Sequence, residues 1–319
     1  MRYTFLGPTG TFTESALLTV PSAVVGERFP SNSVPAALNA VREGVADAAM
    51  VPIENSMEGG VTATLDSIAL DNNLRIIQEV LVPITFVLVA LPGTEIKDIK
   101  RISTHSHAWA QVRLWAEQRV PRAEYVPGQS TAGAAMGLLE DEKPGYDAAI
   151  CAPAVAQAHP ELVVLEENIE DNKQAVTRFV LVAKDPDIPA PTGADKTTLV
   201  VPLPEDRPGA LLELLQQFST SGVNLSRIES RPTGEFLGSY FFSIDADGHI
   251  YDARMRTALR GLHRVSPGIQ FLGSYPRADF RKAEIDSIHS EDAFDSARDW
   301  VESLFPGGRP EQLRHHKHW

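Results

Sequence analysis

Four short motifs in the N-terminal part of the chain carry the side chains that could do chemistry. They are Gly7–Thr11, Glu54–Ser56, Thr104 with Gln111, and Thr177–Phe179. Each lies where a strand is predicted to begin or end. Ligands of open α/β sheets bind outside the carboxyl ends of strands, so polar groups gathered there are candidates for binding or catalysis.

Gly7–Thr11 joins the first predicted strand to the first predicted helix. Backbone amides at such a junction can hold an anion, although a plain tight turn explains these residues equally well. The motif is not a dinucleotide fingerprint, because Pro8 and Thr9 separate its first two glycines.

Glu54, Asn55 and Ser56 follow one another at the end of a predicted buried strand, and Gly59 and Gly60 come next. Turn formation or helix capping would explain Asn55 or Ser56 singly. Three consecutive polar side chains favour a functional site.

Thr104 precedes a predicted helix, and Gln111 comes seven residues later. Two helical turns separate them, so both would project from one side of that helix. Thr104 is also a suitable N-cap, and Gln111 could be a surface amide. His105 and His107 stand two apart on the same helix and so point in different directions, which argues against a shared metal ion.

Thr177, Arg178 and Phe179 begin a predicted strand after a polar loop. The Arg178 guanidinium could bind a substrate carboxylate through two parallel hydrogen bonds. A structural ion pair with an acidic side chain is the alternative.

Composition excludes several classes of protein. The formal net charge of −13 disfavours nucleic acid and anionic membranes as partners. Cys151 is the single cysteine, so the chain has neither an internal disulfide nor a multi-cysteine zinc site, and its apolar neighbours predict a buried thiol. Because no apolar run approaches the roughly 18 residues of a membrane span and no signal peptide is evident, we expect a cytoplasmic protein.

Alternating strand and helix patterns predict an α/β region over residues 1–185, with mostly parallel sheets in two lobes around a cleft. The second lobe is expected at roughly 81–155, with the chain crossing near Leu81–Pro83. The predicted strands are Arg2–Leu6, Val24–Phe29, Ala46–Ile53, Arg75–Val80, Pro83–Leu91, Arg101–Ser103, Glu124–Val126, Asp147–Cys151 and Thr177–Val182. The predicted helices are Thr13–Val20, Pro35–Glu43, Thr62–Leu70, His105–Arg119 and Thr131–Leu139.

A proline-rich linker at 186–196 is predicted to lead into a second domain over 197–276 with the order βαββαβ, the ferredoxin-like arrangement. Small residues at Gly209, Ala210 and Leu211 open its first helix, and its second strand begins near Asn224, Leu225 and Ser226. Free amides at such a helix start suit an amino-acid carboxylate, although simple packing explains Gly209 and Ala210 as well. In the tail, 277–319, Ser290 would cap a helix over 290–304.

Taken in order and spacing, these motifs resemble the prephenate dehydratase family over roughly residues 3–276. The resemblance implies a catalytic region like the type II periplasmic binding proteins and a C-terminal ACT regulatory domain. It implies decarboxylative dehydration of prephenate to phenylpyruvate, regulation by L-phenylalanine, and a homodimer or homotetramer formed through ACT domains. Two residues depart from the family pattern: Thr104 stands where serine is usual, and Ala175 where asparagine is common.

Carried over to this sequence, the resemblance gives three sets of candidate residues. The catalytic candidates are Glu54, Asn55, Thr104, Gln111, Thr177 and Arg178. The further substrate contacts are Thr9, Ser56 and Phe179. The phenylalanine contacts are Gly209, Ala210, Leu211, Asn224, Leu225 and Ser226.

The chemistry that the resemblance implies needs a proton donor for the departing hydroxyl, and it needs no metal or other cofactor. We expect Arg178 to anchor a carboxylate and Thr177 to hydrogen-bond the hydroxyl. Since a threonine hydroxyl is too weak an acid to act alone, Glu54 or a bound water would supply the proton. Two alternatives stay open: an arogenate dehydratase, and an amino-acid sensor or binding protein without catalytic activity.

Overall fold

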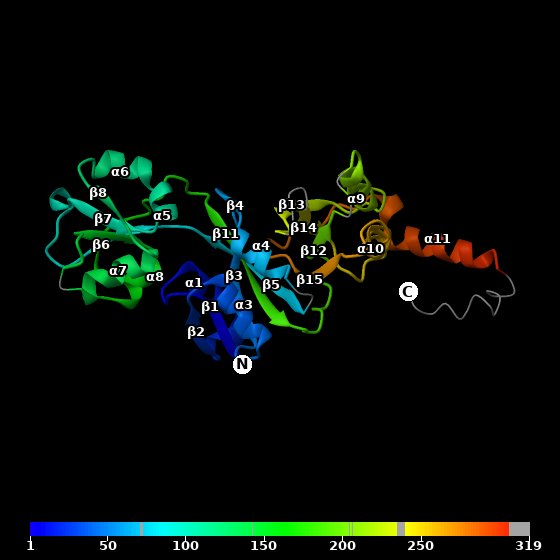
Figure 1. Cartoon of the computed structure of the whole chain (residues 1–319), viewed down its shortest axis with the longest axis horizontal. Helices are drawn as coiled ribbons and strands as arrows, with labels where there is room; N and C mark the ends of the chain where they lie inside the picture. Colours follow the sequence, from blue (N-terminus) through cyan, green and yellow to red (C-terminus); the bar gives the residue numbers. More distant parts are fainter. Residues whose placement is uncertain (71–72, 142, 204, 206, 235–239, 306–319) are drawn as a thin grey trace. The chain divides into compact units, whose positions relative to one another are not determined.

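The structure, a computed structural model, describes residues 1–70, 73–141, 143–203, 205, 207–234 and 240–305. The chain divides into two compact units, Met1–Asp187 and Ile188–Trp319. Both units combine helices with sheets, so the predicted α/β class is confirmed (Figure 1).

The first lobe of unit 1 is built on a sheet with the strand order β2-β1-β3-β11-β5, and the short β4 pairs with β3. β1 runs parallel to β2 and β3, whereas β11 runs antiparallel to both β3 and β5. The strands are β1 Arg2–Leu6, β2 Glu27–Ser31, β3 Ala48–Asn55, β4 Gly59–Gly60, β5 Leu74–Pro83 and β11 Val176–Lys184. Its helices are α1 Phe12–Leu18, α2 Pro21–Val24, α3 Val34–Arg42 and α4 Thr62–Ile68.

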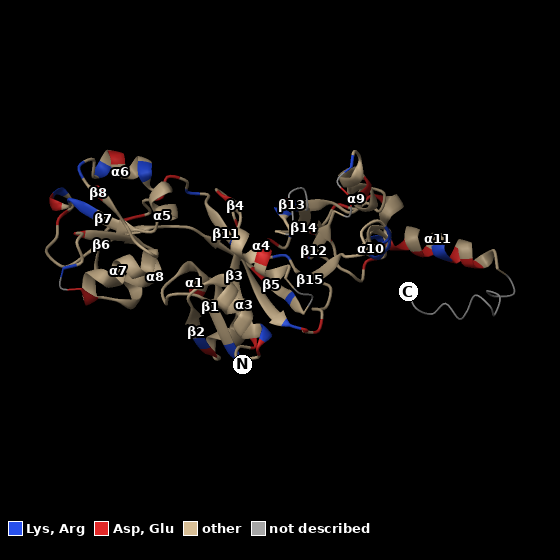
Figure 2. Ribbon diagram, in the orientation of Figure 1, with Lys and Arg blue, Asp and Glu red and all other residues tan. Residues whose placement is uncertain are grey.

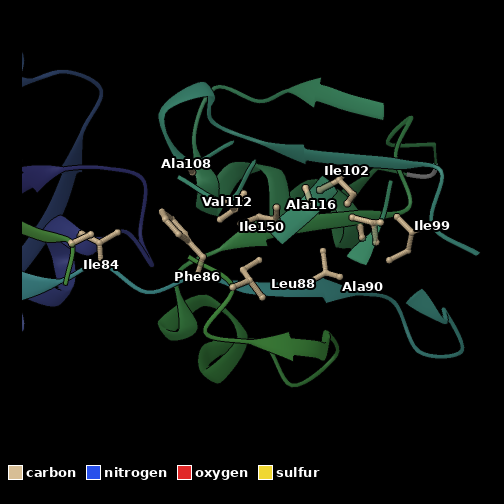
Figure 3. Close-up of a cluster of buried hydrophobic side chains, with 14 residues drawn as sticks. Ile84, Phe86, Leu88, Ala90, Ile99, Ile102, Ala108, Val112, Ala116 and Ile150 are labelled. Atoms are coloured by element: carbon tan, nitrogen blue, oxygen red, sulfur yellow. The ribbon is translucent and has the colours of Figure 1, made fainter. Parts of the chain in front are cut away.

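The second lobe holds a sheet with the order β10-β6-β9-β7-β8. Its strands are β6 Val87–Ala90, β7 Arg101–Thr104, β8 Glu124–Pro127, β9 Ala148–Cys151 and β10 Val163–Glu167. Its helices are η1 Ile96–Asp98, α5 Ser106–Ala110, α6 Arg113–Arg119, α7 Thr131–Glu140 and α8 Pro153–Ala158. Apolar side chains such as Phe86, Ile102 and Ile150 form its core (Figure 3). Cys151 lies in this sheet and is buried, as predicted.

Both sheets of unit 1 are mixed, which corrects the prediction of mostly parallel sheets. β11 enters the first sheet antiparallel to its neighbours, and β6 pairs antiparallel with β9 and β10 in the second. β10 also extends the second lobe past residue 155, so the chain returns to the first lobe between Glu167 and Val176. β10 was not predicted, because its sequence, with exposed valines followed by glutamates, contains no buried apolar run.

The helix predicted over His105–Arg119 is two helices, α5 and α6, with Gln111 as the C-cap of the first. Asp171, far along the chain, causes the break. Its carboxylate accepts hydrogen bonds from the amides of Leu114 and Trp115 at 2.9 and 3.0 Å, and its own amide donates to the Gln111 carbonyl at 2.7 Å. A distant carboxylate thus caps the start of α6.

Unit 2 contains the predicted βαββαβ order in an antiparallel sheet, β13-β14-β12-β15. Its elements are β12 Asp195–Pro202, α9 Ala210–Ser219, β13 Leu225–Pro232, β14 Tyr240–Asp247, α10 Ala253–Val265 and β15 Gln270–Pro276. Leu199, Ile244 and Met255 belong to the core between sheet and helices. The sequence pattern predicts the third strand over Gly238–Ala246, and its first two residues lie outside the described residues.

Beyond β15 the chain continues through η2 Ser287–His289 to α11 Glu291–Ser303. Ser290 caps α11, since its hydroxyl oxygen accepts the amide of Ala293, as the sequence predicts. Acidic residues recur along this helix (Figure 2). Within the described part of the chain, no helix has the length and apolar character that crossing a membrane requires.

Candidate active site

A cavity of about 410 Å³ in unit 1 is lined by residues of both lobes. The lining residues come from the junction of β1 and α1, the ends of β3 and β5, the start of β11, α5, and the start of α7. The lining residues are Leu6, Gly7, Thr11, Phe12, Thr13, Asn32, Asn55, Ile84, Phe86, His105, His107, Ala108, Gln111, Gln129, Ser130, Thr131 and Thr177. Three of the candidate catalytic residues are among them: Asn55, Gln111 and Thr177.

Asn55 and Thr177 are joined by a hydrogen bond across two neighbouring strands. The Asn55 Nδ2 donates to the Thr177 Oγ1 at 2.9 Å, and the Asn55 Oδ1 accepts the amide of Met57 at 2.8 Å. Both ends of the Asn55 amide are therefore occupied, which fixes its orientation. Because the Thr177 oxygen accepts from Asn55, its hydroxyl proton is directed to another acceptor. Thr177 thus faces the cavity as a hydrogen-bond donor.

Arg178 and Glu54 pair with each other but do not line the cavity. The Arg178 Nε donates to the Glu79 Oε2 at 2.7 Å, and its Nη1 reaches the Glu54 Oε2 at 3.4 Å. Successive residues of a strand point to opposite faces, so Arg178 and Glu54 lie behind the sheet face that carries Thr177 and Asn55. For Arg178, the structural ion pair left open by the sequence is the arrangement observed.

Gln111 presents an unused acceptor at the cavity. Its Nε2 donates to the His107 carbonyl at 3.1 Å, while its buried Oε1 has no hydrogen-bond partner. A buried acceptor without a partner is costly, and a substrate hydroxyl or amide would satisfy it. Gln111 reaches this place as the C-cap of α5 and not from the middle of a helix.

Thr104 does not reach the cavity. It is the last residue of β7, is fully buried, and donates its hydroxyl to the Ile150 carbonyl at 2.7 Å. This bond joins β7 to the neighbouring β9. Neither the predicted place on the wall of the cleft nor the N-cap alternative is correct, since His105 caps α5.

The three additional substrate contacts also lie away from the cavity lining. Thr9 is exposed in the turn before α1. Ser56 binds the start of β11, where its hydroxyl oxygen accepts the Val176 amide at 3.0 Å. Phe179 is buried in the apolar core beneath α1. Ser56 and Phe179 therefore support the strands that hold Thr177.

His105 and His107 line the cavity and were not among the candidates. The His107 Nδ1 lies 2.5 Å from the Glu58 Oε2, which joins α5 of the second lobe to the β3–β4 turn of the first. Burial lowers the pKa of His105 from its ordinary value of 6.5, His107 lowers it further, and Glu58 partly opposes both. In the sequence, their spacing of two indicates only that they do not share a metal ion.

The first turn of α7 contributes backbone donors to the cavity. Ser130 caps this ten-residue helix by accepting the Gly133 amide at 2.8 Å, and Ser130 and Thr131 both line the cavity. The earliest amides of a helix lack partners within the helix and carry a partial positive charge. No Lys, Arg, Asp or Glu is among the described lining residues, and the positive end of the α7 dipole can attract an anion to this side of the cavity.

An apolar wall completes the cavity. Phe12 of the first lobe and Phe86 of the second contact edge to face, with ring centroids 5.6 Å apart, and Ile84 and Ala108 lie beside them in the lining. The Phe12–Phe86 contact joins the cores of the two lobes. One side of the cavity therefore suits a ring, and the other suits hydroxyl and carboxylate groups.

In unit 2 the candidate effector residues line two different cavities. Ala210 lines one with Arg207 and Glu213, and Gly209 before it has a φ of 89°, as suits a glycine at this helix start. Asn224 and Ser226 line another, of about 520 Å³. Leu211 is half-exposed, and Leu225 packs against the core of the unit.

Comparison with known proteins gives a consistent family. The model of the family described as prephenate dehydratase matches residues 3–187. A prephenate dehydratase of Amycolatopsis methanolica is 41% identical over 96% of this chain and 98% of its own length. The crystal structure of prephenate dehydratase from Arthrobacter aurescens in complex with L-Phe is 64% identical, with a TM-score of 0.92 over 96% of this chain and all of that one.

A further similar structure carries a different description. GqqA, described as a novel type of quorum quenching acylase, is 29% identical, with a TM-score of 0.78 over 88% of this chain and all of that one. The family model and the curated relative nevertheless agree over most of the sequence. This chain belongs to the prephenate dehydratase family.

Proposed function

We propose that the cavity of unit 1 converts prephenate to phenylpyruvate, water and carbon dioxide. The observation that carries the proposal is the Asn55–Thr177 hydrogen bond, which turns the Thr177 hydroxyl into an oriented donor at a cavity with one apolar and one polar side. The curated relative with 41% identity over nearly the full chain bears the corresponding name.

The reaction breaks two bonds of the substrate ring. The ring carboxylate leaves as carbon dioxide, its bonding electrons enter the ring, and the opposite carbon–oxygen bond breaks as the ring becomes aromatic. The departing hydroxide takes up one proton to become water. An oriented donor at that oxygen, the role assigned to Thr177, contributes typically 10²- to 10³-fold to the rate.

The remaining lining residues divide the rest of the substrate between them. Phe12 and Phe86 would contact the ring, the start of α7 would attract the carboxylate of the side chain, and the Gln111 Oε1 would accept a hydrogen bond from the ring hydroxyl. No lysine or arginine among the described lining residues faces the carboxylate that departs. A cation there would stabilise the ground state more than the transition state, since the charge is lost during the reaction.

The proton donor in this proposal differs from Glu54. The Glu54 carboxylate contacts Arg178 behind the Thr177 face of the sheet, so it is poorly placed to protonate a group in the cavity. We therefore assign the proton to solvent, relayed to the departing oxygen by a water beside Thr177, the other source expected from the sequence. The proposed roles of Arg178 and Glu54 are to fix the positions of β11 and β3.

L-Phenylalanine is the proposed effector, and unit 2 is the proposed ACT domain that binds it. The L-Phe complex of the 64% identical relative supports this assignment. Ala210 and Asn224 line separate cavities of one chain, and the proposal is that one effector contacts Ala210 of one copy and Asn224 of another. A homodimer or homotetramer through these units is therefore part of the proposal. The cytoplasmic location also stays a prediction, which cell fractionation would test.

The experiment is the release of phenylpyruvate from prephenate by the purified chain, followed by its absorbance in alkali. The proposal predicts product in proportion to enzyme and a decrease in rate when L-phenylalanine is added. A parallel reaction with arogenate tests the alternative, an arogenate dehydratase, which would form phenylalanine. Binding of phenylalanine without product from either substrate would instead identify a sensor and refute the proposed activity.

A further inference from the structure

The tail beyond β15 supplies cations to the cavity that contains Asn224 and Ser226. Arg277, Arg281 and Lys282 line that cavity of about 520 Å³ together with these two residues. All three cations follow Pro276, where the βαββαβ order ends. The tail is thus one wall of the cavity.

A chain of polar contacts holds the start of the tail in this place. The Asn224 Nδ2 donates to the Asp247 Oδ2 at 2.8 Å, and the Arg277 Nη1 donates to the Asp247 Oδ1 at 2.6 Å. Arg277 also donates hydrogen bonds from its Nε and Nη2 to the Asp279 carboxylate, which holds the pKa of that carboxyl well below its usual range. The position of the tail is therefore fixed against β13 and β14.

Arg281 and Lys282 are exposed, and no acidic side chain among the described residues forms an ion pair with either. Asp247 is already bound to Arg277 and Asn224. Arg281 and Lys282 therefore lie at this cavity without an ion-pair partner among the described residues. Such groups favour a ligand that carries an anionic group.

The cavity also offers an acceptor for a positive group. Because Asn224 donates its Nδ2 to Asp247, its carbonyl oxygen is left as the acceptor of that side chain, and Glu284 adds a carboxylate to the lining. Donors and acceptors side by side match a zwitterion, whose carboxylate and ammonium are only a few bonds apart. Apolar area for a large side chain is lacking here, so this cavity suits the polar head of an amino acid.

We propose that Arg281 and Lys282 of the tail bind the carboxylate of the amino-acid effector while the Asn224 side chain accepts its ammonium. The inference rests on the proposed regulation by L-phenylalanine and adds the tail to that site. It follows that effector affinity depends on residues outside the βαββαβ fold. Catalysis without effector does not depend on them, since neither residue belongs to unit 1.

Calorimetric titration of the full chain with L-phenylalanine tests this assignment. The double variant R281A/K282A should bind L-phenylalanine about tenfold more weakly than the unaltered chain. The double variant R281K/K282R, which keeps both positive charges, should bind within about threefold of the unaltered chain. R298A is the matched control, because Arg298 is an exposed tail arginine on α11 whose partners are Asp295 and Asp299. It should bind as the unaltered chain does.

Three results would overturn the inference: affinity within about twofold after the double alanine exchange, equal loss in the charge-keeping variant, or no phenylalanine binding by the unaltered chain. Turnover of prephenate without effector, measured in the same preparations, keeps this test apart from the proposed function. If the chain does not turn over prephenate but binds phenylalanine in a way that depends on the charges at 281 and 282, the dehydratase is refuted and the tail site is supported.

Discussion

Thr177 and Arg178 are neighbours in β11 whose side chains have different surroundings. The Thr177 hydroxyl faces a cavity, whereas Arg178 donates to Glu79 at 2.7 Å on the opposite face of the sheet. Both members of the Arg178–Glu79 pair are buried, with 6% and 2% of their side chains exposed. A buried pair of this kind mainly stabilises the position of its strands.

Removing Arg178 should therefore reduce stability more than chemistry. Arg178→Met leaves the Glu79 carboxylate without this guanidinium, which typically costs roughly 3–5 kcal/mol of unfolding free energy. Arg178→Met combined with Glu79→Met should cost less than the sum of the two single changes. Urea unfolding measures both. A folded Arg178→Met variant whose kcat has fallen a hundredfold would show instead that Arg178 acts on the substrate.

Replacing Gln111 should affect the reaction more than the stability of the fold. Gln111→Met removes the unsatisfied Oε1 and also the Nε2 hydrogen bond to the His107 carbonyl, so the two effects offset each other and the melting temperature should change little. The same change removes the proposed acceptor for the substrate hydroxyl, and we expect kcat/KM for prephenate to fall by about tenfold or more. Unchanged kcat/KM in a stable variant would remove Gln111 from the site.

Of the residues predicted from the sequence, Asn55, Gln111 and Thr177 line the cavity, whereas Glu54, Arg178, Thr104 and Phe179 do not, and their roles in the reaction stay predictions. The motifs do not specify which face of a strand each side chain occupies, because the face depends on the register between β3 and β11. His105 and His107 were passed over because the cavity depends on the second lobe folding against the first. No local pattern reports such a contact.

At the scale of elements, α5 begins at the cavity and depends on His105 as its cap. The His105 Nδ1 accepts the His107 amide, and a protonated ring cannot accept that bond. Burial lowers the pKa of His105, so the unfolded chain takes up the proton near pH 6.5 and the folded chain only at lower pH. Stability from this residue is therefore present above pH 6.5 and is lost as pH falls from there through the lower pKa of the folded chain.

His105→Asn tests this pH dependence, because asparagine can cap a helix but does not titrate. The unaltered chain should lose more melting temperature than the variant between pH 7.5 and pH 5.5. His107 and Glu58, which both act on the pKa of His105, remain in both proteins. Equal losses would show that His105 does not titrate in this range.

Most elements could be predicted from the sequence, because their apolar periodicity is local. β1, α3, α7 and β9 lie within about two residues of their predicted bounds. The break between α5 and α6 could not be predicted, since Asp171, which caps α6, is 57 residues from Leu114. The same holds for β10, whose place depends on pairing with β6.

At the scale of the whole molecule, the chain is two units with separate cores joined by a segment without helix or strand between Lys184 and Asp195. Asp187 is exposed in this segment. Brief treatment with a protease that cuts before aspartate should cleave there first and leave two resistant fragments, separable by mass. Early cleavage inside either unit would contradict this division.

The central claim is that the Thr177 hydroxyl, oriented by Asn55, donates a hydrogen bond to the departing group of prephenate. Thr177→Val keeps the shape and removes the donor, and Thr177→Ser keeps the donor. Turnover of prephenate by both variants is the most direct test. We expect kcat to fall by about 100-fold or more in Thr177→Val and to stay within about tenfold in Thr177→Ser. A Thr177→Val enzyme within about threefold of the unaltered kcat would contradict it.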